Sequence, residues 1–368
     1  MEKKTIIAGI SHGDINGIGY EVIIKALMDP MINEFCVPVV YGSPKVAAYH
    51  RKALNINNFS FNNIRYAEEA NHKKANMINC LDDNVRVELG KPTPQGGEAA
   101  FISLERALED LKNGRINVLI TAPIDKKNIQ SSNFTFSGHT EYLKSKSGAE
   151  DVLMFMISEN MRIGFATGHI PLKTVSENIT TELLVNKIRL MNKSLILDFA
   201  IRKPKIAVLG INPHAGENTL LGTEEAEIII PAIKRAENED ILTFGPFSAD
   251  GFFGSGAFTR FDGILAMYHD QGLAPFKALS FDSGVNFTAG LPFVRTSPVH
   301  GTAFSIAGKG EASENSFRQA IYLACNIYRN RQMHAEISQN PLKHQDIEIH
   351  TDKVDELPPD IFNAEHQI

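Results

Sequence analysis

The sequence predicts an α/β fold in which a mostly parallel sheet carries helices on its faces. Apolar runs typical of strands alternate with amphipathic helical stretches almost to residue 330. The apolar runs are short and end in Gly, Pro or Asn, as buried strands do where they pass into loops. With 368 residues, 43% of them hydrophobic and 22% charged, the chain is long enough for one large α/β domain or two medium ones.

Each expected element has its own local signal. The helix at 98–112 places Phe101, Leu104, Leu108 and Leu111 on one face and stops at Asn113-Gly114. The remaining expected elements are strands at 5–10 and 117–122, a helix at 20–28 after a glycine-rich loop, helices opening at Thr180-Thr181-Glu182 and at Thr223-Glu224-Glu225, and a last helix capped by Ser313 or Ser316 that runs to about Tyr328.

Two stretches lack strong periodicity. Residues 50–85 are rich in Asn and Lys, and we expect a surface excursion with short strands there. Residues 331–368 mix His, Asp, Glu and Pro with few apolar anchors, which indicates a partly disordered extension. We expect the histidines of this tail to be solvated; they are His334, His344, His350 and His366.

Composition excludes several classes of function. The formal charge of −6, without a Lys/Arg block, gives no electrostatic reason to bind nucleic acid. Cys36, Cys80 and Cys325 are far apart and form neither a CxxC pair nor a disulfide framework, as expected in the reducing cytoplasm. The apolar run near the N-terminus is too short for a signal peptide or a membrane span. We therefore expect a cytoplasmic protein without nucleic-acid or membrane partners.

Three apolar runs, at 161–169, 206–214 and 264–272, each lead to a histidine followed by turn-forming sequence. Ligands of open α/β sheets bind at the carboxyl ends of strands, and three imidazoles delivered there suit a divalent metal with a coordination position left for substrate. A lone histidine at a strand end is most often structural, and separations of 45 and 55 residues match no short metal motif. The pattern alone leaves both interpretations open.

The usual dinucleotide fingerprint is missing, because Gly17-Ile18-Gly19 lacks a third glycine in place. The glycine-rich stretch at 300–310 leads into a helix and would let backbone approach a nucleotide closely. Taken alone, that stretch is better explained as a turn-rich connector. The segment Ser137-Gly138-His139-Thr140-Glu141 precedes helical sequence and could hold a phosphate, although Thr140 as an ordinary helix cap would explain it too.

Lys277, Asn286 and Arg295 follow the third histidine at spacings of eight to nine residues, in a stretch dense in Gly and Pro. Such loop residues suit a phosphorylated anionic substrate, with arginine able to form a bidentate contact. Each residue taken singly is more commonly a surface side chain.

Taken together, these segments resemble the 4-hydroxythreonine-4-phosphate dehydrogenase family of vitamin B6 biosynthesis over most of residues 5–330. The residues that carry the resemblance are 137–141 (SGHTE), 212–217 (NPHAGE), 269–272 (HDQG), 290–297 (GLPFVRTS) and 300–303 (HGTA). The resemblance implies an isocitrate/isopropylmalate dehydrogenase-like fold with two α/β/α domains and a cleft between them. We expect residues 1–125 and 285–335 to form the first domain, on the cofactor side. The second domain would be 126–284, with the metal ligands and the dimer interface, and 336–368 would be a tail.

The resemblance also assigns roles to individual residues. It implies metal ligands at His169, His214 and His269, substrate-binding residues at His139, Thr140, Lys277, Asn286 and Arg295, cofactor-binding residues at Gly301, Thr302 and Gly308, and a site aspartate at Asp250. We expect Lys277 or Asp250 to remove the substrate proton. In the family the metal lies at a dimer interface with ligands from both chains, so the resemblance implies a homodimer with a shared active site.

The implied reaction uses NAD, or NADP, and one divalent metal per site, Zn, Mn, Co or Mg. It oxidises the C3 hydroxyl of 4-phosphohydroxy-L-threonine, and loss of carbon dioxide then gives 3-amino-2-oxopropyl phosphate. A sister dehydrogenase acting on D-threonate or D-erythronate 4-phosphate is the nearest alternative. A metal-dependent hydrolase or phosphatase, which needs no dinucleotide, and a non-catalytic metabolite-binding protein are alternatives of other classes.

One segment departs from the family pattern. The N-terminal loop usually carries two prolines, but here Gly13-Asp14-Ile15-Asn16-Gly17-Ile18-Gly19-Tyr20-Glu21 has none. Because proline fixes φ, we expect this loop to be less rigid than in relatives.

Overall fold

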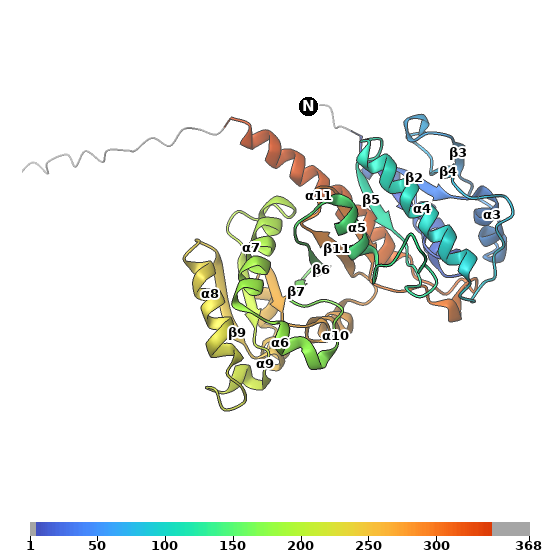
Figure 1. Cartoon of the computed structure of the whole chain (residues 1–368). Coiled ribbons are helices and arrows are strands. Elements are labelled where there is room, and N and C mark those ends of the chain that lie inside the picture. Colours follow the sequence, from blue (N-terminus) through green and yellow to red (C-terminus); the bar gives the residue numbers. More distant parts are fainter. Residues whose placement is uncertain (1–4, 341–368) are drawn as a thin grey trace, which may run out of the picture.

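A mixed sheet of twelve strands runs through residues 5–340, the part of the chain that this computed structural model describes (Figure 1). Its strands are β1 (Ile7–Ser11), β2 (Val37–Gly42), β3 (Asn62–Ile64), β4 (Asn76–Asn79), β5 (Val118–Thr121), β6 (Leu153–Ile157), β7 (Arg162–Phe165), β8 (Lys205–Leu209), β9 (Leu242–Phe247), β10 (Gly263–Ala266), β11 (Val285–Ala289) and β12 (Val294–Pro298). Their order across the sheet is β3-β4-β2-β1-β5-β12-β11-β6-β7-β10-β8-β9.

The sheet consists of two parallel blocks joined by antiparallel strands. All neighbours from β3 to β12 are parallel, as are β7, β10, β8 and β9. The pairs β12–β11, β11–β6 and β6–β7 between them are antiparallel. The expectation of a mostly parallel sheet is confirmed, and the expected strands at 5–10 and 117–122 are β1 and β5 with slightly shifted ends.

The helices lie over both blocks, which occupy opposite ends of the sheet in Figure 1. They are α1 (Gly19–Leu27), α2 (Ile32–Phe35), α3 (Pro44–Ala53), α4 (Pro94–Lys112), α5 (His139–Ser147), α6 (Val175–Asn178), α7 (Thr181–Leu197), α8 (Ile230–Glu237), α9 (Ala249–Gly254), α10 (His269–Ser280) and α11 (Asn315–Ser338). Thr180 caps α7 as expected, since its side chain accepts a hydrogen bond from the Leu183 amide. The helix expected to open at 223–225 begins with a π-helical turn, Glu225–Ile229, that continues into α8. None of the described helices is long and apolar enough to cross a membrane.

The expected end and caps of the last helix are wrong. Helix α11 continues past Tyr328 to Ser338, so it also crosses the expected start of the tail at residue 336. The Nε atom of Arg331 lies 2.6 Å from Asp198 Oδ1. This ion pair secures a part of the helix that has few apolar anchors. The N-cap is Glu314, while the Ser316 hydroxyl donates to the Gly284 carbonyl. His334 lies in α11, whereas His344, His350 and His366 lie outside the described residues.

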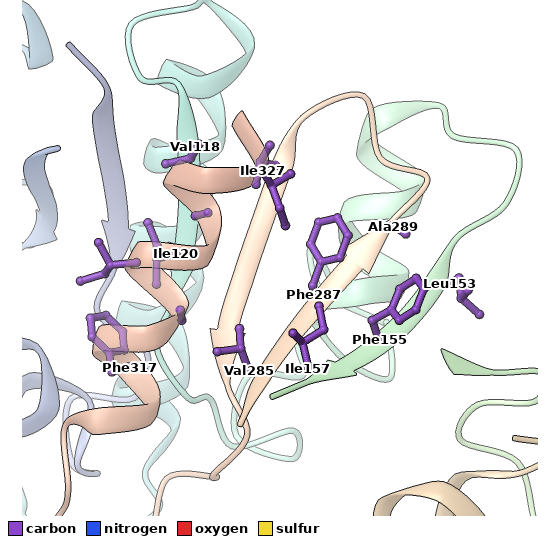
Figure 2. Close-up of a cluster of buried hydrophobic side chains, with 14 of the residues drawn as sticks. Val118, Ile120, Leu153, Phe155, Ile157, Val285, Phe287, Ala289, Phe317 and Ile327 are labelled. Atoms are coloured by element: carbon purple, nitrogen blue, oxygen red, sulfur yellow. The ribbon is translucent and has the colours of Figure 1, made fainter. Parts of the chain in front are cut away.

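The hydrophobic core is continuous across the junction of the two blocks. Figure 2 shows Phe155 of β6 beside Phe287 of β11, and their ring centroids are 6.3 Å apart. The same cluster includes Val118 and Ile120 of β5 and Phe317 of α11, all essentially buried. Helix α11 packs against β12, β11 and β5. The antiparallel strands are therefore fixed in place by the same core that supports both halves.

The N-terminal loop, in which two prolines of the family pattern are missing, is buried and hydrogen-bonded to the segment at 88–93. The Asn16 side chain donates to Thr93 Oγ1 (2.9 Å) and accepts from the Glu88 amide (2.7 Å), and the Asn16 carbonyl accepts from the Gly90 amide (2.8 Å). Tyr20 stands where the family usually has the second proline. Hydrogen bonds from one asparagine thus supply constraints that the absence of proline could not predict.

Candidate functional site

A cavity of about 280 Å³ lies between loops that follow strands of both blocks. One wall comes from the segments after β5 and β12, and the opposite wall from the segments after β7 and β10. The cavity brings together eight of the residues expected in the site: His139, Thr140, His169, His269, Lys277, Asn286, Arg295 and Gly301. Four others do not line it: His214, Asp250, Thr302 and Gly308.

Arg295 brings a buried positive charge to this cavity. Its side chain belongs to β12, and the residue is 2% exposed. The guanidinium donates to Thr121 Oγ1 (2.7 and 3.1 Å) and to Thr288 Oγ1 (3.2 Å), which are neutral partners. Burial lowers the pKa of Arg295 to about 10. Within residues 5–340 no carboxylate forms an ion pair with it, so the site has a strong preference for an anionic ligand.

Several uncharged polar atoms around Arg295 also lack partners. His139 begins α5, and its Nε2 is buried and unpaired among the described residues, as is Asn286 Oδ1. Burial lowers the pKa of His139 well below its usual value, and Arg295 and Lys126 add to that effect, so the imidazole is neutral. The N-cap of α5 is Gly138, and the alternative of Thr140 as an ordinary cap is wrong. The cavity is therefore built for a polar, negatively charged ligand.

Two of the three histidines expected to bind metal meet at the wall of the cavity. His169 follows β7 and His269 follows β10, which are parallel neighbours, and the two ring centroids are 5.5 Å apart. His214 follows β8, on the other side of β10, and it is exposed outside the cavity. Within the described part of the chain, no group of three His, Cys, Asp or Glu side chains is assembled as a metal site.

All three histidines share a feature that suits metal ligands. The Nδ1 atom faces a carboxylate oxygen in each: Glu217 at 2.8 Å from His214, Asp270 at 2.6 Å from His269, and Glu141 at 3.7 Å from His169. At His214 and His269 the carboxylate is at hydrogen-bond distance, so it fixes the tautomer and leaves the Nε2 lone pair available, as metal-binding histidines typically have it. At His169 the Glu141 carboxylate lies farther from Nδ1, and Nε2 contacts Lys126. The contact with His169 also lowers the pKa of Glu141 to about 2. These residues therefore fit a divalent metal.

The loop that carries His214 is held in an unusual backbone conformation. His214, Ala215, Glu217, Asn218 and Thr219 all have positive φ angles, which cost energy in residues other than glycine. The buried carboxylate of Glu225 secures the start of the loop by accepting from the amides of residues 211 and 212, each at 2.8 Å. The same loop exposes two leucines, at positions 220 (79% exposed) and 221 (44%). The loop thus presents His214 and an apolar surface outward.

Sequence reasoning missed Lys126 and gave no role to His300. Lys126 lines the cavity, and its Nζ lies 3.3 Å from His169 Nε2. His300 also lines it, with a buried Nε2 that lacks a partner in the described residues; burial lowers the pKa of this histidine. The available signal was position, because Lys126 follows the expected strand at 117–122 as closely as the metal-site histidines follow theirs.

Comparison with known proteins shows the family of the chain. The family model described as pyridoxal phosphate biosynthetic protein PdxA matches residues 34–324. The chain is 54% identical to the 4-hydroxythreonine-4-phosphate dehydrogenase of Bacteroides thetaiotaomicron, over 94% of this chain and 95% of the relative. It is 40% identical to a "Putative D-threonate 4-phosphate dehydrogenase" of Oceanobacillus iheyensis, over 89% and 99% of the two chains.

A solved structure of similar fold is the 4-hydroxythreonine-4-phosphate dehydrogenase of Klebsiella pneumoniae, with a TM-score of 0.76 at 32% identity. The match covers 89% of this chain and 99% of that one. The expected α/β fold and the expected dehydrogenase class are confirmed, in preference to a hydrolase or a binding protein. The chain belongs to the PdxA family of pyridoxal phosphate biosynthetic proteins, the 4-hydroxythreonine-4-phosphate dehydrogenases.

Proposed function

We propose that this chain oxidises the C3 hydroxyl of 4-phosphohydroxy-L-threonine with NAD, and that decarboxylation then gives 3-amino-2-oxopropyl phosphate. The observation that carries the proposal is the buried Arg295 guanidinium, which faces the cavity without a carboxylate partner among the described residues. The substrate has a phosphate and a carboxylate, either of which would neutralise it. The high identity to the Bacteroides thetaiotaomicron dehydrogenase supports the same substrate.

The anionic groups of the substrate would bind to the residues that line the cavity beside Arg295. Lys277 supplies an amine that adds a second positive charge when protonated and can act as a base only when neutral, while Asn286 and Thr140 offer neutral hydrogen-bonding groups. His139 is held neutral by burial, so its unpaired Nε2 adds a hydrogen bond and no charge. This set orients the substrate within the cavity before any bond changes.

We infer that His169 and His269 of one chain and His214 of a second copy hold the divalent metal. The carboxylates on their Nδ1 atoms support this role. The position of His214 outside the cavity, on a loop with exposed leucines, supports a homodimer with shared active sites. When bound, the metal supplies Lewis-acid chemistry at the reacting oxygen. Zn, Mn, Co and Mg all suit the proposal.

Proton removal would fall to Lys277 or Asp250. Lys277 lines the cavity with the substrate-binding residues, which supports it as the base. Asp250 lies in α9 on the exposed side near His214, where a hydrogen bond from Ser248 lowers its pKa. If the active site is shared, Asp250 and His214 of one chain would therefore both contribute to the active site of the other chain. Steady-state kinetics of Lys277→Met and Asp250→Asn distinguish the two, because loss of the base lowers kcat, whereas loss of a binding residue acts mainly on KM.

The cofactor would lie along Gly301, Thr302 and Gly308. Gly301 opens onto the cavity and has no atom within 4 Å of the place where a Cβ would stand. The Thr302 carbonyl accepts from the Ile18 amide (3.0 Å), and Gly308 has φ +75° and packs against Leu89. These contacts hold the backbone of the segment in place, as a dinucleotide site requires. When bound, NAD supplies the oxidant, and NADP is the alternative cofactor to compare.

We also infer that the two-domain division, 1–125 with 285–335 and 126–284, is the functional one. Its boundaries fall at the Lys126 loop and at the start of β11, both beside the cavity. The expected tail at 336–368 begins within the last turn of α11, and its residues 341–368 lie outside the described part of the chain. All three cysteines are free, which supports the cytoplasm as the compartment.

The test is NADH formation by purified, metal-loaded protein given 4-phosphohydroxy-L-threonine, D-threonate 4-phosphate or D-erythronate 4-phosphate in separate reactions. The proposal predicts turnover of the amino acid, and NAD and NADP are compared in the same assay. Turnover of the sugar acids alone would overturn the proposed substrate in favour of the function printed for the Oceanobacillus iheyensis relative.

A further inference from the structure

Lys126 lines the cavity and contacts an expected metal ligand, but the family motifs discussed above assign it no role. It lies on the loop after β5, and its side chain crosses to the opposite wall, where Nζ is 3.3 Å from His169 Nε2. Neighbouring Lys127 is also exposed but does not line the cavity. Lys126 and Lys127 therefore have the same side-chain chemistry, but only Lys126 lines the cavity.

The contact indicates which ring nitrogen of His169 carries the proton. An ammonium group only donates hydrogen bonds, so His169 Nε2 accepts from Lys126, and the ring proton is on Nδ1, facing Glu141. This neutral tautomer is the one that binds a metal through Nε2. The Lys126 ammonium thus occupies the lone pair that the metal would use.

A single lone pair cannot serve both cations. Metal binding at His169 would therefore displace Lys126 from Nε2, and its flexible four-carbon side chain could turn to another part of the cavity that it lines. Its Cε is 3.6 Å from the place where a Cβ of Gly138 would stand, next to His139 at the start of α5. Lys126 also contributes to the lowered pKa of His139, in keeping with that closeness. Among the described residues it forms no ion pair with a carboxylate.

We propose that Lys126 is a further substrate-binding residue, which pairs with the phosphate or carboxylate of the substrate once the metal has taken its place on His169. The proposal rests on the proposed function and deepens it, because it adds a third cation to Arg295 and Lys277 around the anion. It also predicts an order of binding, because the Lys126 ammonium would become available to the anion only after a metal had bound to His169.

The test uses the full-length chain as wild type, Lys126→Met, which keeps the length and removes the charge, and Lys127→Met as the matched control. Titration calorimetry with zinc measures metal binding, and titration of the zinc-loaded protein with inorganic phosphate, without NAD, measures anion binding. Circular dichroism compares the folding of the three proteins.

In Lys126→Met we expect phosphate affinity to fall about 10- to 100-fold, the loss of one charge-assisted contact. Zinc affinity should stay equal to that of the wild type or increase, because the competing ammonium is gone. Lys127→Met should match the wild type in both titrations. Unchanged phosphate affinity in Lys126→Met would overturn the proposal, and so would weakened zinc binding, which would make Lys126 a support for the metal. If the wild type itself binds no phosphate, the result contradicts the proposed anion-binding function of the cavity, on which the role of Lys126 depends.

Discussion

Arg295 Nη2 lies 2.7 Å from Thr121 Oγ1, a contact between the neighbouring parallel strands β12 and β5. The hydroxyl fixes the guanidinium without neutralising it, so the charge is kept for the substrate. Arg295→Met should lower kcat/KM by roughly 100-fold or more, because a charge-assisted contact with the anion is lost. Thr121→Ser keeps the hydroxyl and should stay within a few-fold of the wild type. A kcat/KM for Arg295→Met equal to that of Thr121→Ser would contradict this role.

The division of the metal ligands between two copies predicts complementation. His214→Ala and His169→Ala should each be inactive alone. If the proteins are mixed, unfolded and refolded together, the hybrid dimers should contain one intact site, so about a quarter of the wild-type activity should return. His169→Ala mixed with His269→Ala provides the control. Both histidines of a site come from the same chain in this proposal, so a hybrid dimer of these two variants contains no intact site. Equal recovery in both mixtures, or none in either, would argue against shared sites.

Stability should depend on pH through the rings of His12 and His50. Both stack on Tyr20, with centroids 5.1 and 5.0 Å away, and burial lowers the pKa of each to about 4. The folded chain therefore holds them neutral, while the unfolded chain protonates them near pH 6.5. This contribution is fully present above pH 6.5 and is lost as pH falls toward 4.

Between pH 7 and pH 5 the free energy of unfolding should fall by roughly 2 kcal/mol for each of these histidines. Urea unfolding at the two pH values measures it. His50→Gln should remove about half of the fall, whereas exposed His72→Gln should leave it unchanged. The same fall in His50→Gln as in the wild type would show that other groups control acid stability.

Removing a ring from the core at the junction should be costly. Phe287 is fully buried, between Phe155 and Phe199, with ring centroids 6.3 and 6.0 Å away. Phe287→Ala should lower the free energy of unfolding by about 3–5 kcal/mol, from lost burial plus the cavity left behind. Phe281, 60% exposed, gives the matched control, and Phe281→Ala should change it by about 0.5 kcal/mol or less. Similar losses in both variants, measured by urea unfolding, would contradict the continuous core.

Local patterns predicted many of the strands and helices. The runs that end at His169, His214 and His269 are strands, and they became the neighbours β7, β8 and β10, because short buried apolar runs have few other solutions. The same patterns gave no information on contacts between distant residues. Helix α11 extends to Ser338, where Arg331 pairs with Asp198, and Lys126 contacts His169, 43 residues further along the chain.

Strand direction was also beyond local reasoning. Strand β11 runs antiparallel to both of its neighbours, β12 and β6. The apolar run at 285–289 could not predict this direction, because its pattern is the same whether the neighbouring strand is parallel or antiparallel. His214 shows the same limit at the site, since its sequence context matches that of His169 and His269 while its loop points outward.

The sheet that passes unbroken from one block to the other has a mechanical consequence. The halves on either side of the cavity are joined by hydrogen-bonded strands and a shared core. Any movement of one half relative to the other would therefore have to twist β12, β11 and β6.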